Sequence, residues 1–535
     1  MESLETEVLV VGAGPTGLTL ANILGMHGVR TVIVERNAAT VGEPRAVSID
    51  DESLRTMQYI DLIDVVRGGI VPGYGSYYYA AGGSCFAKVV PDTLEYGFPR
   101  RSAFRQPVLE GQLREGLKRY GCVEARFDTT VERVEDVGRY ARADILGSRL
   151  RGNDKVEVRA QYVVACDGGS SPIREALGIA MSGSTYDCKW LIVDLAGSTD
   201  RFRHTRVFCD PRRPGLALPG PEGTRRYEFM LLPGEDPDAL LDEANVRALL
   251  ARHSAEDAAL PIVRKVVYHF HARLAERWRA GRIFLAGDAA HLSPPFAGQG
   301  MNSGIRDAQN LGWKLAWRIR HGLGAGVLDT YEQERRPHAA SLIQMAVRMG
   351  LVMMPRSILR ARATQAAFRA LALYKPARDY VMQMKWKPPP RFPRGLVLGE
   401  AGALVRGRMF IQPRVERRDG AAVPLDTLLG KGFAVIEWCD GVVANAPPRP
   451  DRPIGAPVIQ VIPRDHRFVA SAGEGIEQVR DSSGAIGALF DAAQIRGVVL
   501  RPDRYVAACL ARASDSGECD RMLEALVGAT DLATA

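Results

Sequence analysis

The stretch GDAAHLSPPFAGQGMN, from Gly287 to Asn302, brings an acid, a histidine, prolines and glycines close together. Such residues could ligate a metal, activate a nucleophile or hold a large polar ligand. A zinc site would need further His or Cys side chains at ligand spacing from His291, which the stretch lacks. A nucleophile elbow would need the pattern G-x-S-x-G, which is also missing. We therefore expect no metal here and interpret His291 as a structural hydrogen-bonding residue.

A second motif, GAGPTG, spans Gly12 to Gly17 and directly follows the apolar run VLVV. A G-x-G-x-x-G turn between a buried strand and a helix is the dinucleotide-binding fingerprint. Gly12 would allow the tight turn, Gly14 would let a pyrophosphate approach the backbone, and Gly17 would allow close helix–strand packing. A helix that begins at Pro15 would offer free backbone amides to the phosphates. The motif therefore predicts a bound dinucleotide.

Three acids follow predicted strands, where ligands of open α/β sheets bind. Glu35 ends the strand VRTVIVER and suits hydrogen bonds from an adenosine ribose. Asp167 follows YVVAC and opens DGGSSPIR, while Asp288 follows RIFLAG. Either of the last two could instead cap a helix. Their order along the chain favours a common ligand.

The elements needed to position these residues predict an α/β protein. A Rossmann-type domain is expected in two pieces, 1–180 and 270–345, because both pieces carry strand–turn–helix patterns. Short alternating segments predict an inserted antiparallel sheet at 181–269 that binds substrate. Residues 346–395 read as helices followed by a proline-rich linker, KWKPPPRFPRG, and 396–535 as a separate small domain.

Composition is that of a globular protein, with 46% hydrophobic and 25% charged residues in a chain of 535. The net charge of +8 comes from dispersed Lys and Arg, so we expect no nucleic-acid partner. No apolar run is long enough to predict a membrane span, and the acidic N-terminus is unlike a signal peptide. Eight dispersed cysteines without a C-x-x-C pair favour reduced thiols and a cytoplasmic location.

Taken together, GxGxxG with its downstream acid, D-G-x-x-S-x-x-R and G-D-A-A-H-x-x-P-P-x-x-G-x-G-x-N resemble the class A FAD-dependent aromatic hydroxylases, with para-hydroxybenzoate hydroxylase as prototype. Within that family, PRAVSIDDESLRTMQ, RRYEFMLLPGE, NLGWKLAW and LDTYEQERRPH are most similar to the 3-(3-hydroxyphenyl)propionate hydroxylases. The resemblance covers about residues 5 to 350. The tail from about 396 is similar to the thioredoxin-like C-terminal domain of phenol-hydroxylase relatives.

The resemblance implies a tightly but non-covalently bound FAD. It implies that Asp288 holds a ribityl hydroxyl, that Pro295 lies beside the reactive flavin carbon, and that the amides of Met301 and Asn302 face the flavin pyrimidine edge. Pro295 and Arg45 are the residues it marks as catalytic. The full set expected to bind the cofactor is Gly12, Gly14, Pro15, Gly17, Glu35, Arg36, Arg45, Gln106, Asp167, Asp288, Pro295, Gly298, Gly300, Met301 and Asn302.

The implied reaction inserts one oxygen atom of O2 into a phenolic ring with NADH or NADPH, by ortho-hydroxylation of 3-(3-hydroxyphenyl)propionate or a similar phenolic acid. Arg36 would either bind the 2′-phosphate of NADPH or be solvated, so the sequence does not distinguish NADH from NADPH as the reductant. Candidate substrate contacts in the inserted sheet are Trp190, Arg225, Tyr227 and Phe229, and Tyr74 to Gly83 is a further candidate wall. For the aromatic residues, a place in the sheet core is the alternative.

Other functions would share these motifs. A hydroxylase of resorcinol-type or polyketide phenols would carry every one of them. A flavin-dependent halogenase would be marked by W-x-W-x-I-P, which is absent from the sequence. A non-catalytic FAD-binding or assembly protein would use the C-terminal domain for contacts between copies. We also expect a homodimer.

Overall fold

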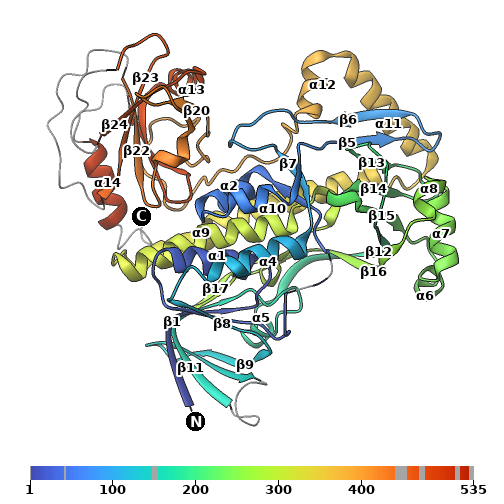
Figure 1. Ribbon diagram of the computed structural model, residues 1–535, viewed down its shortest axis with the longest axis horizontal. Helices are drawn as coiled ribbons and strands as arrows, with labels where there is room; N and C mark the ends of the chain where they lie inside the picture. The colour runs from blue at the N-terminus through green and yellow to red at the C-terminus, as the bar shows by residue number, and fades with distance from the viewer. Residues whose placement is uncertain are drawn as a thin grey trace.

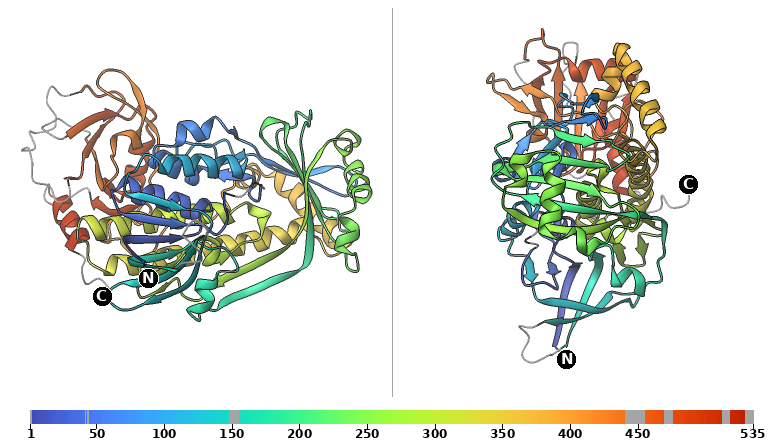
Figure 2. Two further views of the ribbon diagram at one scale, coloured as in Figure 1. Left: turned by 60° about the horizontal axis from the view of Figure 1, so that its bottom comes forward. Right: turned by 90° about the vertical axis from the view of Figure 1, so that its right-hand side faces the viewer.

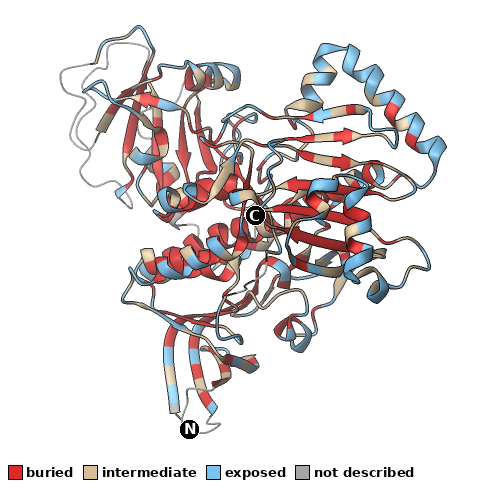
Figure 3. Ribbon diagram, turned by 45° about the vertical axis from the view of Figure 1, so that its right-hand side comes forward, coloured by how far each residue is buried: buried red, intermediate tan, exposed pale blue. Residues whose placement is uncertain are grey.

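The computed structural model describes residues 2–40, 42, 44–147, 155–439, 455–468, 476–511 and 518–528. Two long helices lie at the centre of the molecule (Figure 1). A mostly parallel sheet lies below them, a large antiparallel sheet on one side, and a smaller α/β unit on the other (Figures 1 and 2). The buried residues concentrate along the central helices and the sheets (Figure 3).

The first sheet has eight strands, with the order β17-β18-β11-β1-β2-β8 and with β10 and β9 continuing from β11. Strands β8, β2, β1, β11 and β18 are parallel neighbours, and β1 pairs β2 from Val8↔Thr31 to Val11↔Val34. The predicted βαβ unit is therefore confirmed. The strands are β1 (Glu2–Val11), β2 (Thr31–Val34), β8 (Val123–Arg126), β9 (Thr129–Asp136), β10 (Ala141–Gly147), β11 (Lys155–Ala165), β17 (Arg279–Ala280) and β18 (Ile283–Leu285).

Helices pack on this sheet through apolar faces. The first, α1, packs against α9 and α4, and ends before Gly28, whose φ of +71° suits a residue without a Cβ. A three-stranded sheet, with order β3-β7-β4, lies next to α2. These elements are α1 (Pro15–Met26), α2 (Asp51–Tyr59), α3 (Ile63–Arg67), α4 (Gln106–Leu117), α5 (Pro172–Ala176), α9 (Gly300–Arg320), β3 (Ser48–Asp50), β4 (Ile70–Pro72), β7 (Arg101–Phe104), η2 (Gly287–Ala289) and η3 (Pro295–Ala297).

The second sheet has eight strands in the order β19-β16-β12-β15-β14-β13-β5-β6. It is larger than the predicted insertion at 181–269, because β5 and β6 come from the first part of the chain. Strand β5 pairs in parallel with β13, a contact between distant segments that local patterns do not reveal. The elements are β5 (Ser76–Tyr79), β6 (Cys85–Val89), β12 (Met181–Leu195), β13 (Thr205–Phe208), β14 (Gly215–Pro219), η1 (Pro221–Gly223), β15 (Arg225–Met230), α6 (Pro237–Leu240), α7 (Glu243–Ala251), α8 (Ala255–Ala258), β16 (Ile262–Ala275) and β19 (His291–Leu292).

After α9 the chain forms α10 (Gly326–Met353), α11 (Ile358–Leu373) and α12 (Lys375–Met382). Helices α11 and α12 are largely exposed (Figure 3). Among the described residues, no single helix passes a length and hydropathy test for crossing a membrane, although the bent pair α10 and α11 passes it when combined.

The C-terminal unit is a seven-stranded mixed sheet with the order β21-β20-β24-β23-β22-β25-β26. Strands β22, β23 and β24 are parallel, while β25 and β26 are antiparallel, so this part of the chain is α/β as predicted. The elements are β20 (Arg414–Glu416), β21 (Ala422–Pro424), η4 (Leu425–Leu428), β22 (Ala434–Trp438), β23 (Val458–Ile462), β24 (Ile476–Arg480), α13 (Ala485–Ala493), β25 (Ile495–Leu500), β26 (Val506–Ala511) and α14 (Glu518–Gly528).

The proline-rich stretch is not a free linker. Phe392 is buried and stacks on Tyr505 with ring centroids 4.0 Å apart. Lys387 is tied into a buried ion cluster, described below. In the C-terminal unit, Arg501 forms ion pairs with Glu334 of α10 at 2.7 Å. The two predicted domains therefore share buried contacts, which proline content alone could not indicate.

Candidate active site

A cavity of about 640 Å³ lies where three elements meet. These are the carboxyl ends of the parallel strands, the N-terminus of α9, and the inner face of the second sheet. This volume is typical of cofactor and substrate sites. The residues that line the cavity include every cofactor candidate except Gly17 and Asn302: Gly12, Gly14, Pro15, Glu35, Arg36, Arg45, Gln106, Asp167, Asp288, Pro295, Gly298, Gly300 and Met301.

The glycine turn has the geometry expected of a pyrophosphate cradle. Gly12 has a φ of +103°, and a Cβ there would lie 2.3 Å from the carbonyl oxygen of Cys166. A Cβ on Gly17 would lie 2.0 Å from the carbonyl oxygen of Gly12, so this glycine permits the close packing of α1. At Gly14, by contrast, a Cβ would meet no atom within 4 Å. Gly14 is the N-cap of α1 and makes no side-chain cap, which leaves the helix N-terminus open toward the cavity.

Glu35 stands on the cavity rim at the end of β2. One carboxylate oxygen accepts a hydrogen bond from Ala13 N at 2.9 Å, and the other accepts from Asn37 N at 3.0 Å. A carboxylate can accept further bonds, so Glu35 holds the turn and still offers acceptors to a ribose. Arg36 is exposed on the same rim.

Asp288 is accessible from the cavity, and a buried network supports the turn that carries it. Asp307 of α9 accepts hydrogen bonds from Gly287 N at 3.0 Å and from His291 Nε2 at 2.7 Å. Arg335 Nε donates to its other oxygen at 2.9 Å. Burial opposes ionisation of Asp307, but His291 and Arg335 outweigh it and lower its pKa. His291 is thus placed as a structural residue, as predicted.

The DGGSSPIR motif forms the opposite rim. Asp167 accepts from Ile173 N at 3.3 Å, while its Oδ1 is buried without a partner among the described residues. Burial raises the pKa of this carboxyl. Arg174 is turned inward and donates to the carbonyl oxygens of Gly169 and Ala289, so it fixes the rim to the Asp288 turn.

Arg45 and Gln106 are brought together at the cavity. Gln106 accepts a hydrogen bond from Ala46 N at 2.6 Å and so fixes the segment that carries Arg45. The side chain of Arg45 is exposed and lines the cavity. From the second sheet, Arg226 donates to the carbonyl oxygens of Arg45 and Pro44.

The turn before α9 supplies the next part of the wall. Gly298 has a φ of +62°, and Gly300 and Met301 face the cavity. Gln299 is the N-cap of α9, and its side chain accepts no hydrogen bond from the first helical turn. The backbone amides of that turn therefore remain available to a ligand. The Asn302 side chain points away from the cavity and donates to the carbonyl oxygens of Ser48 at 3.0 Å and Gly298 at 2.7 Å.

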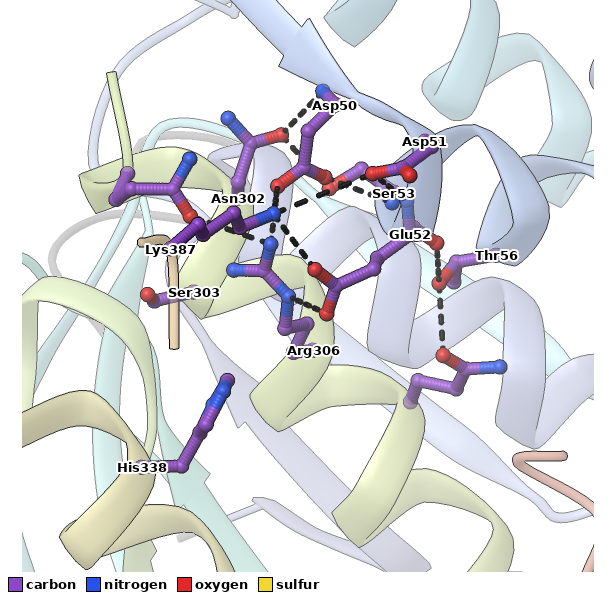
Figure 4. Close-up of polar contacts among 12 residues, drawn as sticks. Asp50, Asp51, Glu52, Ser53, Thr56, Asn302, Ser303, Arg306, His338 and Lys387 are labelled. Carbon is purple, nitrogen blue, oxygen red and sulfur yellow. Dashed lines mark hydrogen bonds and ion pairs between the residues drawn. The ribbon is translucent and has the colours of Figure 1, made fainter. Parts of the chain in front are cut away.

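Beneath this turn lies a buried ion cluster (Figure 4). Arg306 of α9 pairs with Asp50, and its Nε lies 2.6 Å from Glu52. Lys387 from the proline-rich stretch approaches Asp50 at 3.1 Å and Glu52 at 2.7 Å. Burial raises the pKa of Asp51, which lies between Asp50 and Glu52 in the sequence and 4.0 Å from Lys387 Nζ, to about 7. The two cations balance Asp50 and Glu52, and they tie three segments of chain below the cavity.

The second sheet presents a different face to the cavity than we expected. Arg226 and Glu228 of β15 line it, whereas Tyr227 and Phe229 pack on the other face among residues of α7. Arg225 also points away and pairs with Asp200 at 3.1 Å. Alternate residues of a strand face opposite sides, and both faces of β15 are covered. The apolar residues of β15 therefore did not indicate which face of the strand lines the cavity.

Trp190 is fully buried behind the cavity wall. Its ring lies 5.8 Å from that of Phe296, which does line the cavity. The Tyr74 to Gly83 wall is partly as predicted, since Tyr74, Ser76 and Tyr78 face inward. In β5 this again follows the two-residue period of a strand.

Several residues at this site belong to no motif that the sequence analysis identified. Arg101, Arg226 and Glu228 line the cavity, and Arg306 and Asp307 support it. For Arg226 and Glu228 a signal existed, because charged residues that alternate with aromatic ones in a buried strand suggest a polar cavity on one face. For Arg101 no local signal was present.

These features fit a dinucleotide cofactor that extends from the Gly12–Gly17 turn to the N-terminus of α9. Gly14 leaves room for phosphates, Glu35 offers acceptors, and Asp167 has an unpartnered buried oxygen. The fold and site define a dinucleotide-binding protein of the Rossmann type, with the second sheet facing the inner end of the cavity.

Comparison with known proteins names the family. The family model described as "FAD binding domain" matches residues 5–346, and that described as "HcaD C-terminal domain" matches 407–526. A Burkholderia cenocepacia protein named 3-(3-hydroxy-phenyl)propionate/3-hydroxycinnamic acid hydroxylase is 42% identical over 515 residues, covering 94% of this chain and 93% of the relative. A Mycolicibacterium gilvum protein of the same name is 37% identical over 519 residues, covering 96% and 90%. The chain belongs to this family of FAD-dependent aromatic monooxygenases.

Solved structures agree on the fold. The flavin-dependent monooxygenase PieE, in complex with FAD and substrate, superposes with a TM-score of 0.79 at 21% identity, covering 99% of this chain and all of that one. Aklavinone-11 hydroxylase with FAD and aklavinone gives a TM-score of 0.77 at 24% identity, covering 99% and 100%. At such identities the likeness establishes the architecture alone.

Proposed function

We propose that this enzyme hydroxylates a phenolic acid of the 3-(3-hydroxyphenyl)propionate or 3-hydroxycinnamic acid class next to its ring hydroxyl, with O2 and NADH or NADPH. The observation that carries the proposal is that one continuous cavity joins the cofactor cradle to a wall of mixed polar and apolar residues. Relatives that match nearly the whole chain carry these substrates in their names.

When bound, FAD would supply the redox chemistry, accepting a hydride from the nicotinamide and activating oxygen, which side chains cannot do. We propose that the cofactor candidates lining the cavity would hold FAD, and that Asn302 would support them through its hydrogen bonds to Ser48 and Gly298. The open N-terminus of α9 favours negative charge near Met301. Pro295 and Arg45 face the same space and are proposed to contact the reacting part of the cofactor.

The substrate end of the cavity is suited to a ring and a proton acceptor. Leu216, Leu218, Phe296 and Met353 would pack on an aromatic ring and exclude water. Burial raises the pKa of Glu228 to about 7, against the lowering effect of Arg226. A cavity-facing carboxyl that titrates near neutrality can accept the proton of a phenol, so Glu228 is proposed for that step.

The test is a panel of phenols given to the purified holoenzyme with NADH or NADPH. Oxygen uptake that depends on a phenolic acid, with a product one oxygen atom heavier, would support the proposal. Turnover of resorcinol-type or polyketide phenols alone would move the assignment to that class. Bound FAD without substrate-dependent oxygen uptake would indicate a non-catalytic flavoprotein. The homodimer and the cytoplasmic location stay predictions. Light scattering would test the first, and cell fractionation would test the second.

A further inference from the structure

The arginines of the cavity wall differ in their partners. Arg226 is neutralised by Asp194, with its Nε 2.7 Å from the carboxylate. Arg36 and Arg45 lie on the exposed cofactor rim. Arg101 of β7 is different, because among the described residues it bonds to neutral hydroxyl groups and forms no ion pair. Arg36, Arg45 and Arg101 form no ion pair among the described residues, and Arg101 is the one of the three that is not exposed.

The hydroxyl partners of Arg101 are themselves buried. Arg101 Nη1 donates to Ser76 Oγ at 2.7 Å, and Nη2 donates to Tyr74 Oη at 3.0 Å. Its guanidinium lies over the Tyr74 ring, 4.4 Å from the centroid. Ser76 and Tyr74 are 3% and 1% exposed, so the group is held in a fixed position at the cavity wall.

This group has spare donors for an anion. A guanidinium has five N–H bonds, of which two are used here, and Arg101 Nε is buried without a partner. Since the hydroxyls of Ser76 and Tyr74 act as acceptors toward Arg101, their own hydrogens are free to point to a ligand. A fork of parallel N–H donors flanked by hydroxyl groups matches a carboxylate.

The position of Arg101 suits the far end of a phenolic acid. In the second sheet, β13 and β14 lie between β5, which carries Ser76, and β15, which carries Glu228. Three strand spacings separate the two sides by roughly 14 Å. The apolar Leu216 and Leu218 lie between them on β14. A carboxylate would be repelled by ionised Glu228 and attracted by Arg101. These charges would orient the substrate with its carboxylate toward Arg101 and its phenol toward Glu228.

From these contacts we infer that Arg101, with Ser76 and Tyr74, binds the side-chain carboxylate of the substrate and so selects acids over neutral phenols. The inference rests on the proposed function and adds to it a specificity residue. Arg225, the arginine among our expected substrate contacts in the second sheet, faces away from the cavity and pairs with Asp200.

The experiment compares Arg101→Gln, Arg101→Lys and wild type with 3-(3-hydroxyphenyl)propionate and its neutral amide. Dissociation constants come from flavin absorbance titration of the holoenzyme, and KM and kcat from oxygen uptake. We expect Arg101→Gln to weaken binding of the acid by about 10- to 100-fold and to change binding of the amide by less than about 3-fold. Arg101→Lys should recover part of the acid binding, because it keeps the charge without the fork.

Arg100→Gln is the matched control. Arg100 is next to Arg101 in the sequence, but its side chain pairs with Glu95 at 2.7 Å and does not line the cavity. If Arg101→Gln fails to fold or loses FAD, Tyr74→Phe and Ser76→Ala test the same anchor, each with a smaller selective loss for the acid. Equal losses for acid and amide, or a wild type that prefers the amide, would overturn the anchor while the hydroxylase assignment stands. A wild type that binds and oxidises neither compound would overturn both.

Discussion

Replacing Lys387 by Met should destabilise the protein, because this lysine closes the ion cluster beneath the cavity. Its side chain is 7% exposed, and Nζ lies 2.7 Å from Glu52 and 3.1 Å from Asp50. Met has a similar length, so the change removes mainly the charge. Arg306 would then face both carboxylates alone. Removing one partner of a buried ion pair costs about 3–5 kcal/mol.

The effect should depend on pH. Arg306 and Lys387 outweigh burial and lower the pKa of Glu52 to about 2. The stability that ionised Glu52 contributes to the fold is therefore present above the unfolded pKa and is lost only as pH falls toward 2. Burial raises the pKa of Asp51 to about 7, so the native state takes up a proton as pH falls below 7 and gains stability. Without Lys387 the carboxylates should protonate more readily. The stability gap between variant and wild type is therefore expected to narrow from pH 8 to pH 5.

The assay is thermal unfolding of the FAD-loaded protein at pH 8 and pH 5, read by tryptophan fluorescence. At pH 8 the midpoint of Lys387→Met should fall by roughly 3–5 °C. Lys385→Met is the control, because Lys385 is exposed and should tolerate the same change. A midpoint within about 1 °C of wild type at pH 8, or a gap that widens on acidification, would refute the reasoning.

Three further predictions concern the cofactor and the C-terminal unit. Gly17→Ala should abolish folding or flavin binding, since its Cβ would lie 2.0 Å from a carbonyl oxygen, whereas Gly14→Ala should fold but retain FAD poorly; circular dichroism and flavin content distinguish the two. Asp288→Ala should weaken FAD binding by about 1–3 kcal/mol, measured by flavin fluorescence titration, and unchanged affinity would mean that Asp288 makes no cofactor contact. Replacing Cys439 and Cys509 by Ser should leave turnover per folded molecule intact, because Cys509 is buried and no C-x-x-C exists; a selective loss of kcat would indicate a redox role.

Local sequence determined the cofactor half of the molecule. The turn from Gly12 to Gly17 combines steric demands that only glycine meets with a strand–helix junction, so its position along the chain already specifies its role. Asp167 and Asp288 are predicted in the same way, because a residue at the carboxyl end of a parallel strand lies at the ligand edge of the sheet, and both line the cavity. The mixed α/β character of the C-terminal unit also followed from its local patterns.

Tertiary structure alone decided the substrate half. Strand β15 alternates charged and aromatic residues, and only packing against α7 determines that Tyr227 turns away and Glu228 turns inward. Ser76, which accepts a hydrogen bond from Arg101, reaches the cavity because β5 pairs in parallel with β13, two segments far apart in the chain. Lys387 belongs to a proline-rich stretch that reads as a linker until Asp50 and Glu52 are brought beside it. Such partners are set by long-range contacts, whose cost in loop closure is recovered only once the whole fold has formed.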